Sequence, residues 1–197
     1  MNTVPARQTL PTQGRPGAEV LAELRSFGRD DPPYKAGRVW SLVHYLDEAL
    51  ESFLGQAYQA YSSANGLNPT AFKSLKRLES EIIAMVASLF HGPDSTCGVL
   101  TSGGTESCLL AVKTYRDMAR AQRGVSKPEM ILPTTAHVAW FKASEYFGVK
   151  VRLLPLDAQL HADVSALERL INRRTVMILG SAPEYPHGTI DPIGALS

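Results

Sequence analysis

A pair of glycines gives this sequence its clearest candidate for binding an anion. Gly103 and Gly104 lie in the stretch Thr-Ser-Gly-Gly-Thr-Glu-Ser, where an apolar run gives way to a helical pattern. Glycine lets a ligand approach the backbone closely, and the first turn of a helix offers unpaired N–H groups and the positive end of the dipole. Hydroxyl donors are available from Thr105, Ser102 and Ser107. The spacing fits a phosphate-binding turn and equally a tight turn capped by Thr105 or Ser102, and it matches neither a nucleotide P-loop nor a dinucleotide fingerprint.

Two further polar groups follow apolar runs that predict strands. His137 comes after Thr-Thr-Ala, and the stretch 181–192 contains prolines and Gly188 that stiffen the path of Tyr185 and His187. In an open α/β sheet the loops after consecutive strands line one crevice, where ligands bind. The imidazole of His137 can stack there on a planar heteroaromatic ring whose phosphate lies on the glycine turn. The alternatives are a histidine that caps its helix and a loop whose role is structural.

The elements that must position these groups alternate between strands and helices. In residues 93–197 short apolar runs predict strands, and longer runs with helical spacing predict helices between them. This alternation is typical of an α/β domain with a mainly parallel sheet and flanking helices. The expected strands are 98–101, 130–132, 149–154 and 176–179, and the expected helices are 105–121, 137–147 and 163–173.

The part of the chain before this domain predicts a helical segment over residues 17–92. Apolar residues fall at helical spacing in 19–27 and 46–61, and a further long helix follows Thr70, which can cap it. Residues 1–16 are rich in Pro, Gly, Thr and Gln, so we expect a flexible leader. They lack the apolar core of a secretory signal.

Composition limits the class of protein. Of the 197 residues 44% are hydrophobic and 20% are charged, which is typical of a globular protein rather than a disordered one. A net charge of +1 gives no reason to expect a nucleic-acid partner. No stretch approaches the roughly 20 apolar residues of a membrane helix. The two cysteines suit neither a disulfide framework nor a zinc site, so we expect no metal and a cytoplasmic protein.

The motifs together closely resemble the sphingosine-1-phosphate lyases of the group II pyridoxal-phosphate-dependent decarboxylase family. The resemblance begins weakly near Gly37 and extends to the last residue. The matching residues are the stretch 101–107, Leu109, Ala111, Lys113, Tyr115, Arg116, Asp117, Ala136, His137, Phe141, Lys142, Ala143, Tyr146, Phe147, Gly148, Ser181, Pro183, Pro186, His187, Gly188, Asp191 and Pro192.

The resemblance implies a fold and a cofactor. It implies the first part of the large domain of a fold-type-I pyridoxal-phosphate enzyme over residues 93–197, preceded by the helical segment. Gly103, Gly104 and Thr105 would bind the cofactor phosphate, and His137 would stack on the pyridine ring. Tyr185 would be the catalytic residue that reaches toward the substrate or external aldimine.

The resemblance also implies substrate-binding residues in the helical segment. Asn65 would approach the active site, across the interface of a homodimer. In the lyases the segment after this asparagine usually reads Leu-His-Pro-Asp, whereas here Asn68 replaces the histidine. A tyrosine expected upstream is His44 here, which can supply the cation that Asn68 lacks. Both positions are associated with the phosphate of the substrate, so we expect a phosphorylated amine.

The implied activity is cleavage of a sphingoid long-chain-base phosphate to a fatty aldehyde and phosphoethanolamine, through an external aldimine and retro-aldol cleavage. One alternative is a related amino-acid decarboxylase, a carboxy-lyase that releases CO2. Another is a non-catalytic half-subunit that completes a site with a partner chain.

The lysines of the chain bear on its activity. Family members carry an Asp that pairs with the pyridine nitrogen and a Schiff-base Lys in the pattern Asp-x-His-Lys, both beyond the matched stretch. All seven lysines here lie outside such a pattern, so we expect the chain alone to be inactive. It would be a truncated portion of an enzyme or one of two polypeptides that form the site together.

Overall fold

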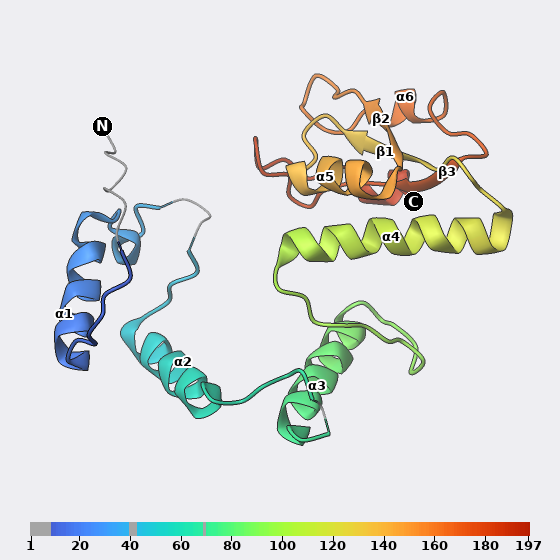
Figure 1. The fold of residues 1–197 in the computed structure, drawn as a ribbon. Helices are drawn as coiled ribbons and strands as arrows, with labels where there is room; N and C mark the ends of the chain where they lie inside the picture. Colours follow the sequence, from blue (N-terminus) through green and yellow to red (C-terminus); the bar gives the residue numbers. More distant parts are fainter. Residues whose placement is uncertain (1–8, 40–42, 69) are drawn as a thin grey trace. The chain divides into compact units, whose positions relative to one another are not determined.

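The computed structural model describes residues 9–39, 43–68 and 70–197. The chain divides into two compact units, residues 1–76 and 77–197 (Figure 1). The first eight residues of the predicted leader, and Pro69 of the predicted substrate segment, lie outside the described residues. The domain boundaries expected from the sequence stay predictions.

The described elements of the first unit are all helical. Its longest helix, α2, begins after Asp47, whose carboxylate accepts a hydrogen bond from the N–H of Leu50 at 2.7 Å. Such an N-cap satisfies one of the unpaired N–H groups of the first turn. As described, neither α1 nor α2 contains a buried residue. The helical elements are α1 (Gly17–Phe27), two 3₁₀ turns (Gly28–Asp30 and Tyr34–Ala36), α2 (Glu48–Tyr61) and the start of α3 (Lys73–Leu89).

The second unit is built around a parallel sheet. Its described strands lie in the order β2-β1-β3, and both neighbours pair with β1 in parallel. This arrangement confirms the predicted α/β class. The strands are β1 (Glu129–Pro133), β2 (Lys150–Leu154) and β3 (Thr175–Ile178), and the helices after α3 are α4 (Gly104–Arg123), α5 (Val138–Phe147), α6 (Val164–Leu167) and α7 (Ile193–Leu196).

The core follows the two-residue period of the central strand. Met130 and Leu132 point to one face of β1 and pack in a buried cluster with Val112 of α4. Ile131 points to the other face and packs in a second cluster with Leu167 of α6. Because successive side chains of a strand alternate between faces, an apolar strand buried on both sides needs helices on both sides. In the described chain no helix is long and apolar enough to cross a membrane.

The strand predicted at 98–101 is wrong. Within the described residues this segment pairs with no strand, and the N–H of Leu100 instead donates to the carboxylate of Glu79 on α3 at 3.0 Å. A side chain on the preceding helix thus takes one of the bonds that a sheet neighbour would provide.

The helix predicted at 163–173 is shorter than expected, since α6 covers only Val164–Leu167. The hydroxyl of Thr175 accepts a hydrogen bond from the N–H of Asn172 at 3.0 Å. The Asn172 side chain donates to the carboxylate of Glu129 at 2.8 Å. These side-chain bonds replace helical bonds, which is a known competition for residues of this type.

Glu129 closes the edge of the sheet where the strands begin. Its side chain is 2% exposed and forms ion pairs with Arg152 at 3.3 Å and Arg174 at 2.7 Å. The hydrogen bond from Asn172, with the one from Arg152 and the charges of both arginines, outweighs the effect of burial and lowers the pKa of Glu129. The carboxylate therefore stays charged and paired at the start of β1.

Candidate active site

Helix α4 begins directly at the glycine pair. Gly104 is its first residue, and Gly103 precedes it in an extended conformation. The N–H of Ser107 bonds the carbonyl of Gly103 at 3.1 Å, so the N–H groups of Gly104, Thr105 and Glu106 precede the first helical bond. Groups in this position have no acceptor within the helix and lie at the positive end of its dipole. The turn therefore offers an anion several backbone donors that converge.

The space beside the glycine pair is open. A Cβ atom added at Gly103 or at Gly104 would meet no other heavy atom of the described chain within 4 Å. The backbone at neither position lies in the left-handed region that favours glycine. Internal packing and backbone strain thus give no reason for glycine here, and close approach of a ligand does.

Side chains hold the turn before α4 in place. The carboxylate of Glu106 accepts hydrogen bonds from the N–H of Ser102 at 2.6 Å and from its hydroxyl at 2.7 Å. These two bonds lower the pKa of Glu106. The hydroxyl of Thr101 lies 2.7 Å from that of Ser107 and 3.1 Å from the carbonyl of Gly103. Ser102 and Ser107 were expected as donors to a ligand, but here both bond within the turn.

The predicted ring-stacking residue is the N-cap of α5. The Nδ1 atom of His137 accepts a hydrogen bond from the N–H of Ala139 at 3.1 Å, and the His137 side chain is exposed. The capping alternative is therefore confirmed. Since Nδ1 acts as an acceptor, a neutral ring carries its proton on Nε2. Capping fixes one edge of the ring and leaves its faces for contact, so stacking stays a prediction.

Three predicted features lie at the same edge of the sheet. His137 follows the end of β1 at Pro133, and the stretch 181–192 follows the end of β3, which runs parallel to β1. Helix α4 ends shortly before β1 begins and packs against α5 and β3, so it runs back along the sheet (Figure 1). Its start at Gly104 therefore points to the edge where the parallel strands end, which is where such sheets bind ligands.

The loop after β3 is tied at both ends. Asp191 is 1% exposed, and its carboxylate accepts the N–H of Ser181 and the N–H of Ala162, each at 2.8 Å. Within the loop Tyr185 is 55% exposed. The predicted catalytic residue thus lies in a fixed loop and remains accessible.

Two buried side-chain atoms lack a hydrogen-bond partner in the described part of the chain. They are Oγ1 of Thr135, between β1 and His137, and Oε2 of Glu184, in the loop after β3. Both belong to segments that follow strand ends, on the candidate-site edge. Unpaired buried polar atoms are rare and need a partner. Neither residue was predicted, since a single Thr or Glu in a loop carries no pattern. The bond of Glu106 to Ser102 was also missed, although acid at the third helical position is a known capping signal.

The predicted substrate residues belong to the first unit and are all exposed there. The side-chain oxygen of Asn65 accepts the N–H of Leu67 at 2.9 Å. That of Asn68 accepts the N–H groups of Thr70 at 3.1 Å and Ala71 at 3.2 Å. The turn before α3 is thus organised by Asn68, a role the sequence suggested for Thr70. Both asparagines use their oxygen within the chain and keep the Nδ2 amide for donation.

The third substrate candidate, His44, borders a small cavity within the first unit. The cavity measures about 120 Å³. Its lining is mixed, with apolar side chains beside the carboxylates of Asp47 and Glu51. The cavity thus has His44 and two acidic residues in its lining.

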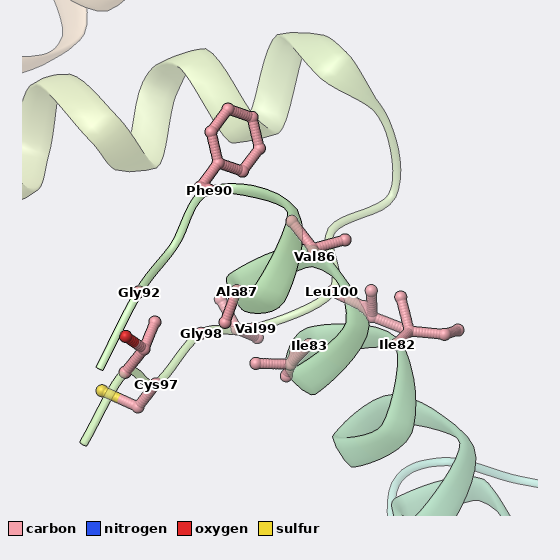
Figure 2. Close-up of a pocket in the computed structure, with 11 residues that line it drawn as sticks. Ile82, Ile83, Val86, Ala87, Phe90, Gly92, Cys97, Gly98, Val99 and Leu100 are labelled. Carbon is pink, nitrogen blue, oxygen red and sulfur yellow. The ribbon is translucent and has the colours of Figure 1, made fainter. Parts of the chain in front are cut away.

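An apolar pocket of about 280 Å³ lies within the second unit, between α3 and the segment that precedes the glycine turn. Figure 2 shows Ile83 and Ala87 of α3 facing the backbone at Gly98 and Val99. A Cβ atom at Gly98 would lie 3.4 Å from the Ile83 side chain, so the two segments pack closely. The pocket contains no predicted site residue, and the polar side chains of its lining are those of Thr96 and Cys97.

The family is established by comparison with known proteins. Residues 47–197 match the family model described as Aminotransferase class-V. The chain belongs to this family. Within it, the chain is 41% identical to sphingosine-1-phosphate lyase 1 of Mus musculus over 94% of its length, and 39% identical to sphingosine-1-phosphate lyase of Saccharomyces cerevisiae over 95%. The resemblance predicted from the motifs is confirmed.

Solved structures agree with this placement. The sphingosine-1-phosphate lyase of Burkholderia pseudomallei superposes with a TM-score of 0.89 at 41% identity, over 97% of this chain and 46% of that one. A glutamate decarboxylase of Lactobacillus brevis matches with a TM-score of 0.77 at 19% identity, which shows the fold alone. The fold-type-I assignment is therefore confirmed. The chain spans about a third of the length of the mouse and yeast lyases (33% and 32%).

Proposed function

We propose that the chain forms part of a pyridoxal-phosphate-dependent lyase that cleaves a sphingoid long-chain-base phosphate to a fatty aldehyde and phosphoethanolamine. The observation that carries the proposal is the open glycine turn at the start of α4, on the same sheet edge as His137. The similarity to sphingosine-1-phosphate lyases over nearly the whole chain supports the substrate class.

The residues at this edge fit pyridoxal phosphate. The N–H groups of Gly104 and Thr105, with the Thr105 hydroxyl, would bind its phosphate. The open space at Gly103 admits the phosphate oxygens close to the backbone. The exposed ring of His137 would cover one face of the pyridine. When bound, the cofactor supplies an electron sink for the carbanion left by bond cleavage.

Glu106 places a negative charge close to this phosphate site. Its carboxylate is bound by the N–H and hydroxyl of Ser102, which disperse that charge. The α4 dipole favours both the carboxylate and a bound phosphate. We therefore assign Glu106 to shaping the turn rather than to contacting the cofactor.

The substrate would be a phosphorylated amine. The Nδ2 amides of Asn65 and Asn68 are donors for its phosphate, and the exposed ring of His44 is the third candidate contact. Tyr185 would reach the substrate from the loop after β3. If His44 and Asn68 bind the phosphate, alanine at either position should weaken binding of the phosphorylated substrate and leave binding of an unphosphorylated one unchanged. Equal losses for both substrates would remove this assignment.

A decarboxylase is the second candidate. A protein of Pyrococcus furiosus named probable L-aspartate decarboxylase is 33% identical over 95% of this chain. Assays of aldehyde and CO2 from the same incubation separate the two activities.

Assembly and location belong to the proposal as well. A cytoplasmic homodimer with sites at the subunit boundary accords with the family. A second polypeptide with the Asp-x-His-Lys segment is the alternative, in which this chain would supply a non-catalytic part of the site. Since the seven lysines of this chain all lie outside that pattern, we expect no internal aldimine on the chain alone.

An absorbance scan tests the proposal. The chain combined with a polypeptide that carries the Asp-x-His-Lys segment should show an aldimine band with pyridoxal phosphate, lose it on borohydride reduction, and release aldehyde from a long-chain-base phosphate. The chain alone should show no such band. Release of CO2 without aldehyde from the combined protein would favour the decarboxylase and contradict the lyase.

A further inference from the structure

Glu184 is a buried carboxylate that the proposed reaction does not yet use. Its residue is 2% exposed, and the loop that follows folds around it. Its Oε1 accepts the N–H of His187 at 2.8 Å, the N–H of Thr189 at 3.3 Å and the Thr189 hydroxyl at 3.1 Å. Burial opposes ionisation, but the hydrogen bonds from Thr189 and His187 outweigh it and lower the pKa of Glu184. The group is therefore a carboxylate, an acceptor only.

The same carboxylate also fixes the ring of a histidine. The Nδ1 atom of His187 lies 3.1 Å from Oε1 of Glu184. Because the carboxylate only accepts, Nδ1 carries a proton in both the neutral and the charged ring. In the neutral ring Nε2 is then the nitrogen with the free electron pair. The His187 side chain is 37% exposed, so the ring has access to a ligand.

We propose that Glu184 and His187 form a carboxylate–imidazole dyad in which Nε2 of His187 accepts the proton of the substrate's C3 hydroxyl. The inference rests on the proposed function, which requires a proton acceptor for that hydroxyl. The dyad lies in the loop after β3, on the edge that also carries His137 and the glycine turn. Glu184 acts through the ring as a positioning residue.

The step balances within the substrate and the ring. The hydroxyl proton moves to Nε2, and the electron pair of the O–H bond becomes the second bond of the aldehyde carbonyl. The C2–C3 bond breaks, and its electron pair stays with C2, the carbon that carries the amine. The imidazolium later returns its proton to solvent or product. A carboxylate on Nδ1 stabilises the charge that the ring acquires, as in other acid–base dyads.

The two oxygens of Glu184 differ in their contacts, since Oε1 makes the contacts with His187 and Thr189. Its Oε2 is buried without a partner in the described residues, so the carboxylate has accepting capacity beyond what the loop uses.

The ring nitrogens can be observed directly in the wild-type chain. A ¹⁵N–¹H correlation spectrum of uniformly labelled protein distinguishes protonated from bare imidazole nitrogens. We expect the neutral ring of His187 to show a protonated Nδ1 and a bare Nε2. His137 is the internal reference with the opposite pattern, since its Nδ1 accepts from Ala139. A bare Nδ1 in His187 would overturn the dyad.

Two variants separate proton transfer from loop closure in the completed enzyme. His187→Asn keeps an amide donor near the Nδ1 position and removes Nε2, whereas Glu184→Gln keeps the side-chain shape and removes the charge. We expect His187→Asn to leave the backbone amide signals of Gly188 and Thr189 in place, to slow cleavage at least 100-fold, and to regain activity with added imidazole.

Glu184→Gln should slow cleavage less and gain nothing from imidazole. Wild-type cleavage rates in His187→Asn would overturn the dyad while the lyase assignment stands. Absence of aldehyde from the wild-type enzyme would instead contradict the proposed function. If His187→Asn disturbs the loop signals, the tautomer of His187 in the wild-type spectrum decides whether the dyad exists.

Discussion

Glu129 and Glu184 are both buried carboxylates of the second unit, but they lie at opposite edges of the same sheet. Glu129 begins β1 and pairs with two arginines and Asn172. Glu184 follows β3 and is held by loop amides, a hydroxyl and one imidazole, with one oxygen unpaired. The edge where strands begin thus neutralises its buried charge fully, and the edge where strands end does not.

This difference in partners predicts that Glu129 mainly affects folding stability and that Glu184 mainly affects catalysis. A buried charge with strong partners contributes mainly to folding, because removal of either partner leaves the other uncompensated. A buried carboxylate held by loop donors and an imidazole, on the edge where ligands bind, can instead serve the chemistry of a site. Substitutions at the two edges should therefore affect different measurements.

Truncation of Glu129 should have the largest effect on folding. Glu129→Ala leaves Arg152, Arg174 and Asn172 without their shared acceptor. We expect a loss of about 3 kcal/mol in the free energy of unfolding, at the low end for buried pairs because Arg174 is half exposed. Urea unfolding followed by circular dichroism measures it. A loss below about 1 kcal/mol would place this network among surface ion pairs.

Truncation of Glu184 should reduce the free energy of unfolding less than truncation of Glu129 does, but it should make the loop around Glu184 less ordered. Glu184→Ala removes hydrogen bonds to a charged acceptor, and we expect a loss of about 1.5 kcal/mol in the free energy of unfolding. Amide hydrogen exchange should accelerate at His187 and Thr189, which donate to it. Unchanged exchange at these amides would contradict the proposed difference between the two edges. A loss of unfolding free energy equal to that of Glu129→Ala would contradict it as well.

Acid should reduce the folding stability that Glu129 provides, by a smaller amount than truncation of its side chain does. The pKa of Glu129 is lower in the folded protein than its usual value of 4.5, so the folded state binds this proton less tightly than the unfolded state. Its contribution is complete above that usual value and is lost as the pH falls through the folded pKa. The stability difference between wild type and Glu129→Gln should therefore shrink below about pH 4.5. A difference that stays constant to lower pH would contradict the shift.

A methyl group in the glycine turn should change stability least. Gly104→Ala places a Cβ in open space at the first residue of α4, so the free energy of unfolding should change by less than about 0.5 kcal/mol. The same methyl occupies the room for the cofactor phosphate, and affinity for pyridoxal phosphate should fall at least tenfold. Gly55→Ala, in α2, also places a Cβ in open space and is the control that should not alter affinity. Equal affinity in both variants would show that the phosphate binds elsewhere.

Much of the fold was predictable from local patterns. The apolar runs at 130–132, 149–154 and 176–179 each correspond to a strand. The reason is clearest for β1, which is buried along its whole length and therefore needs continuous apolar residues. The strand at 98–101 and the length of α6 were mispredicted. In both places a side chain distant in sequence, Glu79 or Glu129, takes part in bonds that replace the regular ones.

The candidate site was predictable in part. The glycine pair and His137 stand at strand–helix junctions, which a period change in the sequence reveals. Glu184 and Thr135 were missed, because their burial and unpaired atoms depend on how loops fold over the sheet edge. Patterns in sequence identify where a site begins, whereas the partners that complete it come from tertiary contacts.

The phosphate contact can be tested directly by titration of the ¹⁵N-labelled chain. Pyridoxal phosphate should shift the amide signals of Gly104 and Thr105 and the ring signals of His137, whereas pyridoxal without the phosphate should leave the two amides unchanged. Identical shifts with both ligands, or shifts confined to other residues, would contradict a phosphate held at the start of α4.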